Sequence, residues 1–376
     1  MKASVITLHT VNNYGSALQT YATQKVLEDL GLEVEFVDYW RRDNRGRYAV
    51  DKALNSPSMQ KYKKYWDRNG LTRRLVRLPL SLMLWRKRAP MRRFISRRIH
   101  LTPRSYYSFD ELLRETPQAD VYITGSDQVW NSVWNQGIEK PFFLEYAPPG
   151  KLRIAFSASI GREKLDESEV EVTREMLLKY HRISMREKSG VELLQKLGIP
   201  SQQILDPTLM LNREQWREIA VPCREKWPYL LVYQLNANAE MDAYAERLAQ
   251  SKDWEILRIS YGYSGKQKKG KCIVCPSVEK LLGYFLQADC VLTDSFHATA
   301  FSLNLSRNFV SILPERFGTR IRSITELTGT QDHVLTDYQD LSVVEKAIDF
   351  QRVQDILDRE RTSARRFLTE ALGLQP

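Results

Sequence analysis

The sequence predicts an α/β protein with two consecutive domains, each built from parallel strands that alternate with helices. Three observations predict this class. Short apolar runs alternate with segments whose apolar residues recur at helical spacing. The alternation lapses once, near the middle of the chain. The length of 376 residues corresponds to two domains of about 150 residues or more.

The first half opens with a strand, a helix and a second strand. An apolar run at 3–8 precedes helical spacing over 17–30, Gly31 ends the helix, and 34–37 is a second apolar run. Such a unit places its two strands parallel in one sheet. We expect the first domain to span residues 1–211. Its further strands are expected at 121–124, 153–157, 183–185 and 203–205, with helices over 167–180 and up to 197.

The second half repeats this alternation after a polar stretch, 212–228, which contains two prolines and is expected to be a linker. We expect a second domain over 229–348 and a C-terminal helix within 349–376. Two halves of similar size predict Rossmann-like domains that face each other across a cleft. The expected strands are 229–235, 254–259, 291–293 and 309–312, with helices over 241–250 and 278–287.

The positive charge of the chain is concentrated in one segment. The net charge is +10, yet residues 61–104 alone carry 15 basic residues against the single acid Asp67. We therefore expect a basic helical insertion over about 43–107 in the first domain. Its mixture of cations and apolar side chains suits a membrane surface, stacking on nucleic-acid bases, or a solvated insertion. The membrane-surface candidates are Trp85, Arg86, Lys87, Arg88, Arg92 and Arg93.

The cysteine count and the apolar segments bear on compartment. Four cysteines are too few for a disulfide framework in this chain. The start lacks a secretory signal pattern, and the apolar run 78–85 is far shorter than the ~20 residues of a spanning helix. We expect a cytoplasmic protein, peripheral at the inner face of the membrane. The lone Cys272-x-x-Cys275 pair does not predict a metal site, and the absence of GxGxxG does not favour a dinucleotide cofactor.

Two polar loops follow predicted strands of the first domain, at the sheet edge where ligands bind in such folds. In the first, Ser16 can cap the next helix with Gln19 completing a capping box, which favours an anion at the helix start. A capped turn at Gly15 is the alternative. In the second, 125–131, amides beside Trp130 suit sugar hydroxyls and a stacked sugar ring, and the alternative is an Asp/Asn turn with Trp130 in the core.

Two further positions carry charge chemistry. Asp294 or Ser295 can cap a helix that holds His297 in its first turn. A helix start lowers a histidine pKa, so a protonated His297 needs a bound anion beside it; a packing histidine is the alternative. Arg186 ends a predicted strand on the cleft side, where its guanidinium suits a carboxylate or phosphate. The alternative is a salt bridge with Glu187 or another surface acid.

These segments together resemble the polysaccharide pyruvyl transferase family. The resemblance implies the two-domain GT-B architecture and transfer of the enolpyruvyl unit of phosphoenolpyruvate onto sugar hydroxyls as a pyruvate ketal, with no cofactor. The basic insertion lies outside it. The matching stretches, in order, are NNYGSALQTYATQKVLEDLGLEVEFVDY, DVYITGSDQVWN, ISMREKSG with ILDPTLML, and VLTDSFHATAFSLN.

The resemblance also implies roles for single residues. His297 of the TDSFH motif is implied as the acid that protonates the methylene carbon of the donor, and Arg186 of SMRE as the donor-anion clamp. Ser295 and Phe296 are expected beside the donor in the second domain, and Asp127 as a catalytic group on the acceptor side. Many family members carry Gly where this chain has Ala298. The expected acceptor-binding residues of the first domain are Asn13, Tyr14, Gly15, Ser16, Gln19, Gln128, Trp130 and Asn131.

Two other functions remain open on the sequence. One is a GT-B glycosyltransferase that uses a nucleotide-sugar donor, although no ribose or base contacts are evident. The other is a non-catalytic protein that binds an anionic surface or nucleic acid. The expected partners are phosphoenolpyruvate, a lipid-linked sugar acceptor and an anionic membrane surface.

Overall fold

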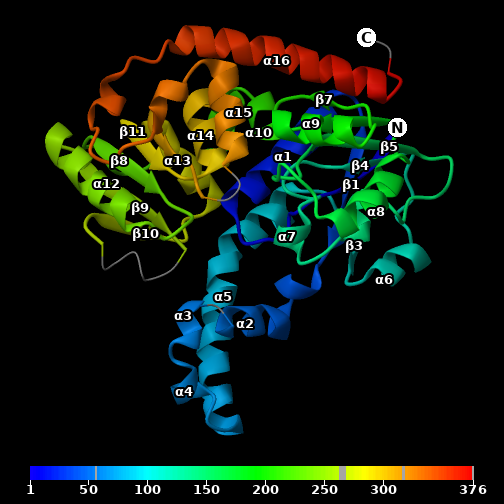
Figure 1. Ribbon diagram of the computed structural model, residues 1–376, viewed down its shortest axis with the longest axis horizontal. Coiled ribbons are helices and arrows are strands. Elements are labelled where there is room, and N and C mark those ends of the chain that lie inside the picture. Colours follow the sequence, from blue (N-terminus) through cyan, green and yellow to red (C-terminus); the bar gives the residue numbers. More distant parts are fainter. Residues whose placement is uncertain (56, 262–267, 316–317, 375–376) are drawn as a thin grey trace.

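The computed structural model describes residues 1–55, 57–261, 268–315 and 318–374, and its strands form two parallel sheets (Figure 1). The first sheet has the order β3-β2-β1-β4-β5-β6-β7 and the second β10-β9-β8-β11-β12-β13. The prediction of two Rossmann-like domains is confirmed. The strands of the first sheet are β1 (Lys2–Ile6), β2 (Glu33–Tyr39), β3 (Leu101–Tyr106), β4 (Val121–Thr124), β5 (Leu152–Ala158), β6 (Arg182–Met185) and β7 (Gln202–Gln203).

The second sheet repeats the strand order of the first. In each sheet the order reverses once, between β1 and β4 and between β8 and β11. A crevice forms at such a switch point beyond the carboxyl ends of the strands. The loops after these four strands therefore surround the place where a ligand is expected. The strands are β8 (Tyr229–Tyr233), β9 (Glu255–Ser260), β10 (Lys271–Val274), β11 (Cys290–Thr293), β12 (Asn308–Ile312) and β13 (Val334–Leu335).

Helices cover the two sheets, and those of ten residues or more, apart from the one over 319–328, lie where periodicity predicts them. The helix over 278–287 has the predicted bounds, whereas β3 and β10 were not expected, because both are edge strands with few buried residues. The helices are α1 (Tyr14–Asp29), α6 (Phe109–Arg114), α7 (Ser132–Asn135), α8 (Glu167–Leu177), α9 (Lys188–Lys196) and α10 (Pro207–Met210), then α11 (Arg213–Ile219), α12 (Ala239–Lys252), α13 (Val278–Gln287), α14 (Phe296–Asn304), α15 (Thr319–Thr328) and α16 (Phe350–Ala371).

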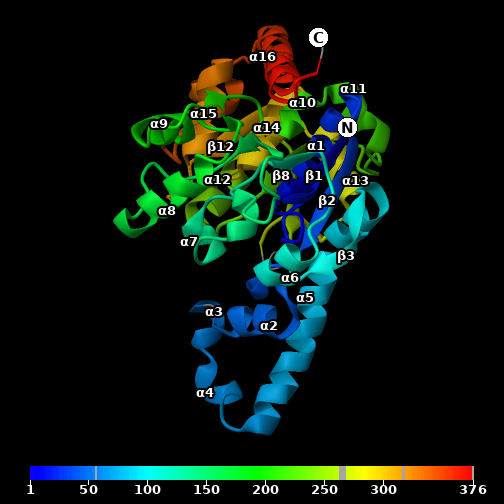
Figure 2. The ribbon, with the colours of Figure 1, turned by 90° about the vertical axis from the view of Figure 1, so that its right-hand side faces the viewer.

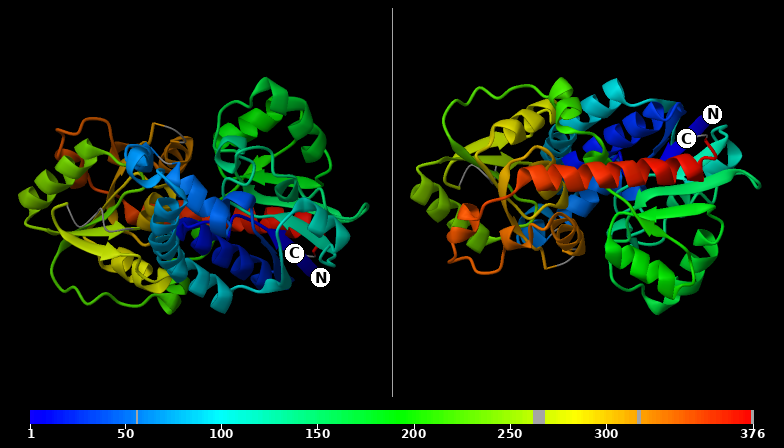
Figure 3. Two further views of the ribbon diagram at one scale, coloured as in Figure 1. Left: turned by 90° about the horizontal axis from the view of Figure 1, so that it is seen from below. Right: turned by 90° about the horizontal axis from the view of Figure 1, so that it is seen from above.

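Two segments join the domains. The stretch expected as a linker begins with α11, whose Trp216 is fully buried against Phe301, with ring centroids 5.0 Å apart. Helix α16 crosses from the second domain back onto the first, as the view from above shows (Figure 3). Its Arg361 donates to the Leu209 carbonyl at 2.7 Å and to Asn304 Oδ1 at 2.8 Å. The C-terminal helix therefore fixes one domain against the other.

The basic insertion forms a helical arm that projects from the body (Figures 1 and 2). At its base, Phe94 and Ile95 are buried in the core that α1 also lines. Its outer part instead exposes apolar side chains along α5. In the described part of the chain, no helix is both long and apolar enough to span a bilayer. The arm consists of α2 (Gly46–Leu54), α3 (Pro57–Gln60), α4 (Lys63–Trp66) and the 29-residue α5 (Gly70–Arg98).

Candidate active site

The loop after β1 starts helix α1 earlier than predicted. Asn13 is the N-cap, its Oδ1 accepting from the Gly15 amide at 2.8 Å, so the capping box predicted for Ser16 and Gln19 is wrong. Ser16 lies inside the helix, and its hydroxyl donates to Asp127 Oδ2 at 2.5 Å. The amide of Gln19 is fully buried and donates to Thr7 Oγ1 at 3.0 Å. Gln19 therefore supports the loop and does not face the cleft.

Tyr14 and Gly15 bring α1 against the second domain. The Tyr14 hydroxyl is buried and donates to the Pro276 carbonyl at 2.6 Å, so this residue joins the domains and does not bind a ligand in this arrangement. At Gly15, a Cβ atom would lie only 2.1 Å from Nδ1 of His297. Glycine is therefore required here so that the imidazole can rest on the first turn of α1.

The loop after β4 supplies one carboxylate to the site. Asp127 has a positive φ of 80° and is buried beside Ser16. Burial alone raises the pKa of the Asp127 carboxyl, but Arg186 and His297 outweigh it and lower that pKa to about 2. Asp127 is therefore ionised at neutral pH. Gln128, in the same loop, lines the cleft as expected of an acceptor-side residue.

Two other residues of this loop do not have the predicted position. Trp130 is 3% exposed, stacks on Phe143 and donates its indole N–H to the Phe142 carbonyl at 2.9 Å. It offers no face to a sugar, because the hydrophobic core takes both of its surfaces. Asn131 is fully buried and caps α7 by accepting from the Trp134 amide at 3.0 Å. The alternative of an Asp/Asn turn with a core Trp130 is thus the one found.

The second domain provides His297 as predicted, in the first turn of α14 with Ser295 as the N-cap. His297 is buried and lines the cleft, and its Nε2 has no hydrogen-bond partner among the described residues. Burial lowers the pKa of His297 to about 4, although Asp206 and Asp127 partly oppose this. The imidazole is therefore neutral at pH 7 in the free site, with one nitrogen available to a ligand.

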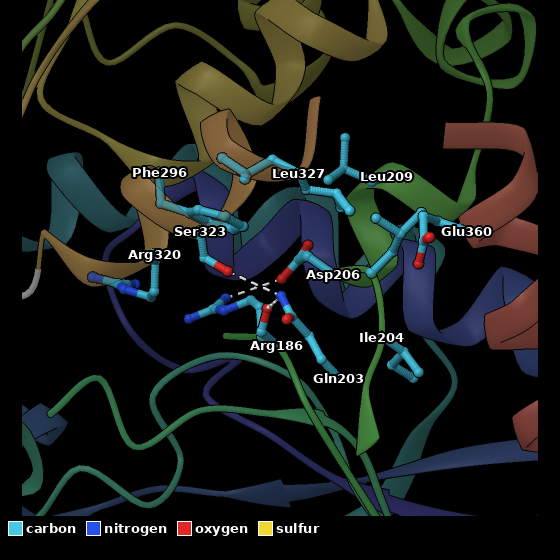
Figure 4. A pocket seen from close by; sticks show the side chains of 12 residues that line it. Arg186, Gln203, Ile204, Asp206, Leu209, Phe296, Arg320, Ser323, Leu327 and Glu360 are labelled. Atoms are coloured by element: carbon cyan, nitrogen blue, oxygen red, sulfur yellow. Dashed lines mark hydrogen bonds and ion pairs between the residues drawn. The ribbon is translucent and has the colours of Figure 1, made fainter. Parts of the chain in front are cut away.

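Arg186 lies between the two carboxylates of the first domain. Its Nη1 donates to Asp206 at 2.9 Å, as Figure 4 shows, and Nη2 is 3.5 Å from Asp127. The guanidinium carbon lies 4.8 Å from the ring centroid of Phe296, across the domain boundary. Its Nε and Nη2 make no hydrogen bond within the described residues. Arg186 thus forms the expected ion pair with Glu187, whose Oε2 lies 3.8 Å from Nε, and adds Asp206 and Asp127, while Nε and Nη2 keep hydrogen-bonding capacity for a ligand.

The sequence reasoning missed Arg320 and Asp206. Arg320, near the start of α15, points toward the same Phe296 ring, with 5.9 Å from its guanidinium carbon to the ring centroid. Its side chain reaches the amide of Gln128, which accepts from it at 3.0 Å when the amide oxygen faces Arg320. Burial and the nearby Arg186 lower the pKa of Arg320 to about 10, so it stays charged at pH 7. Only its place at a helix start could have indicated it.

The family model of polysaccharide pyruvyl transferase matches residues 13–316. The chain belongs to the polysaccharide pyruvyl transferase family. A comparison with curated protein sequences found no match.

Solved structures show the same fold as this chain. MnaA of S. aureus, solved with UDP, aligns at a TM-score of 0.51 and 11% identity, covering 100% of this chain and 97% of that one. AviGT4, a glycosyltransferase involved in avilamycin A biosynthesis, aligns at 0.51 and 12% identity, covering 99% and 97%. The GT-B-like architecture implied by the sequence resemblance is therefore confirmed.

The cleft of the transferase lies between the two domains and has a volume of about 830 Å³. Ser16, Asp127 and Gln128 line it from one side, and His297 from the other. An adjoining pocket of about 200 Å³ holds Arg186, Asp206, Phe296 and Arg320. Arg320 and Phe296 line both spaces. Among the described residues no group of three or more His, Cys, Asp or Glu side chains is placed to hold a metal ion.

Proposed function

We propose that this enzyme transfers the enolpyruvyl unit of phosphoenolpyruvate onto two hydroxyls of one sugar and so forms a cyclic pyruvate ketal. The observation that carries the proposal is the unpartnered Nε2 of His297, which lies in a cleft beside two guanidinium groups. A small dianionic or trianionic donor suits the guanidinium pair, because each group offers donors to phosphate and carboxylate oxygens.

Donor binding prepares the acid. Arg320 and the free donors of Arg186 bind the phosphate and carboxylate of the donor. The added negative charge raises the pKa of His297, which then takes up a proton. Arg186 keeps its hydrogen bond to Asp206, which fixes the orientation of the guanidinium. The same contact keeps the Asp206 carboxylate near the imidazole, where its charge favours the protonated form of His297.

The chemical step begins when Nε2 of His297 gives its proton to the methylene carbon of phosphoenolpyruvate. The neighbouring carbon becomes oxocarbenium-like and bonds to a sugar hydroxyl oxygen, whose proton returns to His297. A second hydroxyl of the same sugar then attacks this carbon, the bond to the phosphate oxygen breaks, and phosphate leaves with the second hydroxyl proton. The products are the ketal and inorganic phosphate.

Asp127, expected as a catalytic group on the acceptor side, is better suited to electrostatic support than to proton transfer. A carboxyl pKa of about 2 makes it a weak proton acceptor at neutral pH. Its charge instead favours protonated His297, and its contact with Ser16 holds that hydroxyl at the acceptor side of the cleft. Asn13 and Gln128 also line the cleft and are proposed to bind the acceptor.

The acceptor is proposed to be a cell-surface polysaccharide precursor carried on a lipid, with the arm resting on an anionic membrane. The predicted contacts need correction within the arm. Trp85, Arg86 and Arg93 are exposed, whereas Arg88 is half-buried and donates to the Asn44 carbonyl at 2.6 Å. Lys87 is also half-buried, and Arg92 lies over Trp40 at 5.3 Å. Leucines of α5, absent from the prediction, supply most of the exposed apolar surface.

Incubation with phosphoenolpyruvate and a lipid-linked glycan extract tests the reaction. We expect phosphate release together with a ketal on the glycan, detected by mass spectrometry. A parallel reaction with a UDP-sugar tests the glycosyltransferase alternative. Sugar transfer from UDP without phosphate release from phosphoenolpyruvate would overturn the proposal.

A further inference from the structure

A second cavity, of about 350 Å³, lies at the base of the arm. One wall comes from the segment between β2 and α2, with Trp40, Asn44 and Arg45, and the other from α5, with Trp85 and Arg88. The pyruvyl transfer described above uses none of these side chains. Their composition combines cations with aromatic rings.

Three guanidinium groups line this arm-base cavity. Arg45 lies 5.5 Å from the ring centroid of Tyr107, and Arg92 lies 5.3 Å from that of Trp40. Burial and the neighbouring Arg92 lower the pKa of Arg88, which indicates that the cations crowd one another. Among the residues that the structure describes, no Asp or Glu side chain lines the cavity. Asp43 is the acid whose charge partly opposes the lowering of the Arg88 pKa. It is already paired with Arg41 at 3.3 Å and with Lys52 at 2.7 Å.

Two buried donors among the described lining residues have no acceptor. Nδ2 of Asn44 makes no hydrogen bond, and Asn44 is 8% exposed. Nε of Arg45 is likewise without a partner. Buried donors are normally paired, and two that are unpaired beside three cations indicate a missing anionic acceptor. A phosphoryl group supplies several such oxygens at once.

We propose that the arm-base cavity binds the phosphoryl group of an anionic lipid. Helix α5 indicates that the phosphoryl group belongs to a lipid, because it exposes five large apolar side chains at spacings of four and three residues along one helix face. Trp85 is the last of them and also lines the cavity. Leucines gain by entering the acyl boundary and cannot stack on bases, so a membrane fits better than nucleic acid. The five are Leu71, Leu75, Leu78, Leu82 and Trp85, each more than 60% exposed.

The same helix also reaches toward the cleft. Lys87 lines a pocket of about 240 Å³ together with Asn236 and Tyr261, and these two residues line the catalytic cleft as well. A phosphoryl group held at the arm base therefore lies beside a path into the site. This part of the inference rests on the proposed function, because it takes the sugar acceptor to be lipid-borne.

Cosedimentation of the full-length protein with phosphatidylcholine vesicles, with and without phosphatidic acid, tests the cavity. The double variant Arg45→Gln/Arg88→Gln removes two lining cations. Its charge-matched control, Arg74→Gln/Arg97→Gln, removes two exposed cations of α5 that do not line the cavity. We expect the first pair to lose about tenfold more affinity for phosphatidic acid vesicles than the control pair, as loss of one charge-assisted hydrogen bond implies. Equal losses would overturn the proposal.

A variant that leaves the net charge unchanged distinguishes binding in the cavity from general electrostatic attraction between the basic arm and the anionic vesicle. Asn44→Leu keeps every cation but removes the unpaired donor, so we expect weaker vesicle binding, and unchanged binding contradicts a built site. Circular dichroism and calorimetric binding of phosphoenolpyruvate verify that each variant is folded.

Glycerol 3-phosphate as competitor distinguishes the sources of the phosphoryl group. Release of the protein from vesicles shows that the phosphoryl group alone suffices for binding, and retention shows that the bilayer is needed. Vesicle binding requires no turnover. The cosedimentation result therefore tests the cavity even if the pyruvyl transfer reaction is not observed.

Discussion

At the scale of single residues, the proposed reaction depends on a histidine that is neutral in the free site and becomes an acid only when the donor binds. His297 is buried with a pKa of about 4, near two carboxylates and two guanidiniums. Without a donor the arginines and burial keep it unprotonated. The negative charge of the donor changes that balance, so binding and protonation are coupled.

Removing the imidazole tests the acid. We expect His297→Ala to lower kcat by about 10²- to 10⁴-fold, the usual contribution of a general acid. Donor affinity should change much less, because the acid acts mainly in the transition state. Phosphate release and calorimetric titration with phosphoenolpyruvate measure the two effects. Turnover equal to that of the unmodified enzyme would reject the mechanism.

Proton uptake provides a second test at this scale. Since the complex holds more protons than the free enzyme above pH 4, donor affinity should rise as pH falls from 8 toward 5. Titrations at pH 7 in buffers with different ionisation enthalpies should show net uptake of up to about one proton. His297→Asn should lack this uptake. Uptake that persists in the variant would assign the proton to another group.

Arg320 is predicted to bind the donor and not merely to support the fold. Arg320→Gln should weaken phosphoenolpyruvate binding by about tenfold or more, as expected for one lost charge-assisted contact. Arg322→Gln, an exposed arginine on the same helix, is the matched control and should bind normally. Equal donor affinities in the two variants would remove Arg320 from the site. Arg186 is less suitable for this test, because its loss strands buried Asp206 and Asp127.

At the scale of elements, α1 and α14 meet where only a glycine fits. Gly15 allows His297 to lie on the first turn of α1, so the two domains share one reacting centre. Through this contact, a helix of the first domain determines the position of His297 in the second.

Gly15→Ala is expected to displace the imidazole, because the added Cβ would lie 2.1 Å from its Nδ1. We predict a fall in kcat of at least about tenfold, since small displacements of reacting groups are costly. Gly70→Ala is the control, as nothing lies within 4 Å of its added methyl. A similar loss in both variants, or none in either, would contradict this contact. Thermal unfolding distinguishes displacement of the imidazole from unfolding of the protein.

At the scale of the whole molecule, α16 holds the domains in register. Arg361 is 8% exposed and connects the Leu209 carbonyl of the first domain with Asn304 of the second. This contact holds the cleft-lining loops of the first domain opposite His297. The arm, in contrast, extends away from both domains (Figure 2).

Arg361→Met is therefore predicted to destabilise the protein by about 2–4 kcal/mol, because two buried acceptors lose their donor. The control Arg366→Met changes an exposed residue of the same helix and should alter the free energy of unfolding by less than about 0.5 kcal/mol. Urea unfolding measures both. Comparable free energies for the two variants would show that α16 does not tie the domains.

The sequence by itself determined the alternation of strands and helices, the two domains and the positions of His297 and Arg186 at strand ends, because periodicity and capping are local properties. It also located the basic insertion. Only the tertiary structure decided that Trp130 and Asn131 are buried, that Gln19 supports a loop and that Asn13 caps α1. Arg320 and Asp206 likewise joined the site through folding, since residues distant in sequence meet only where two sheets expose the carboxyl ends of their strands to one cleft.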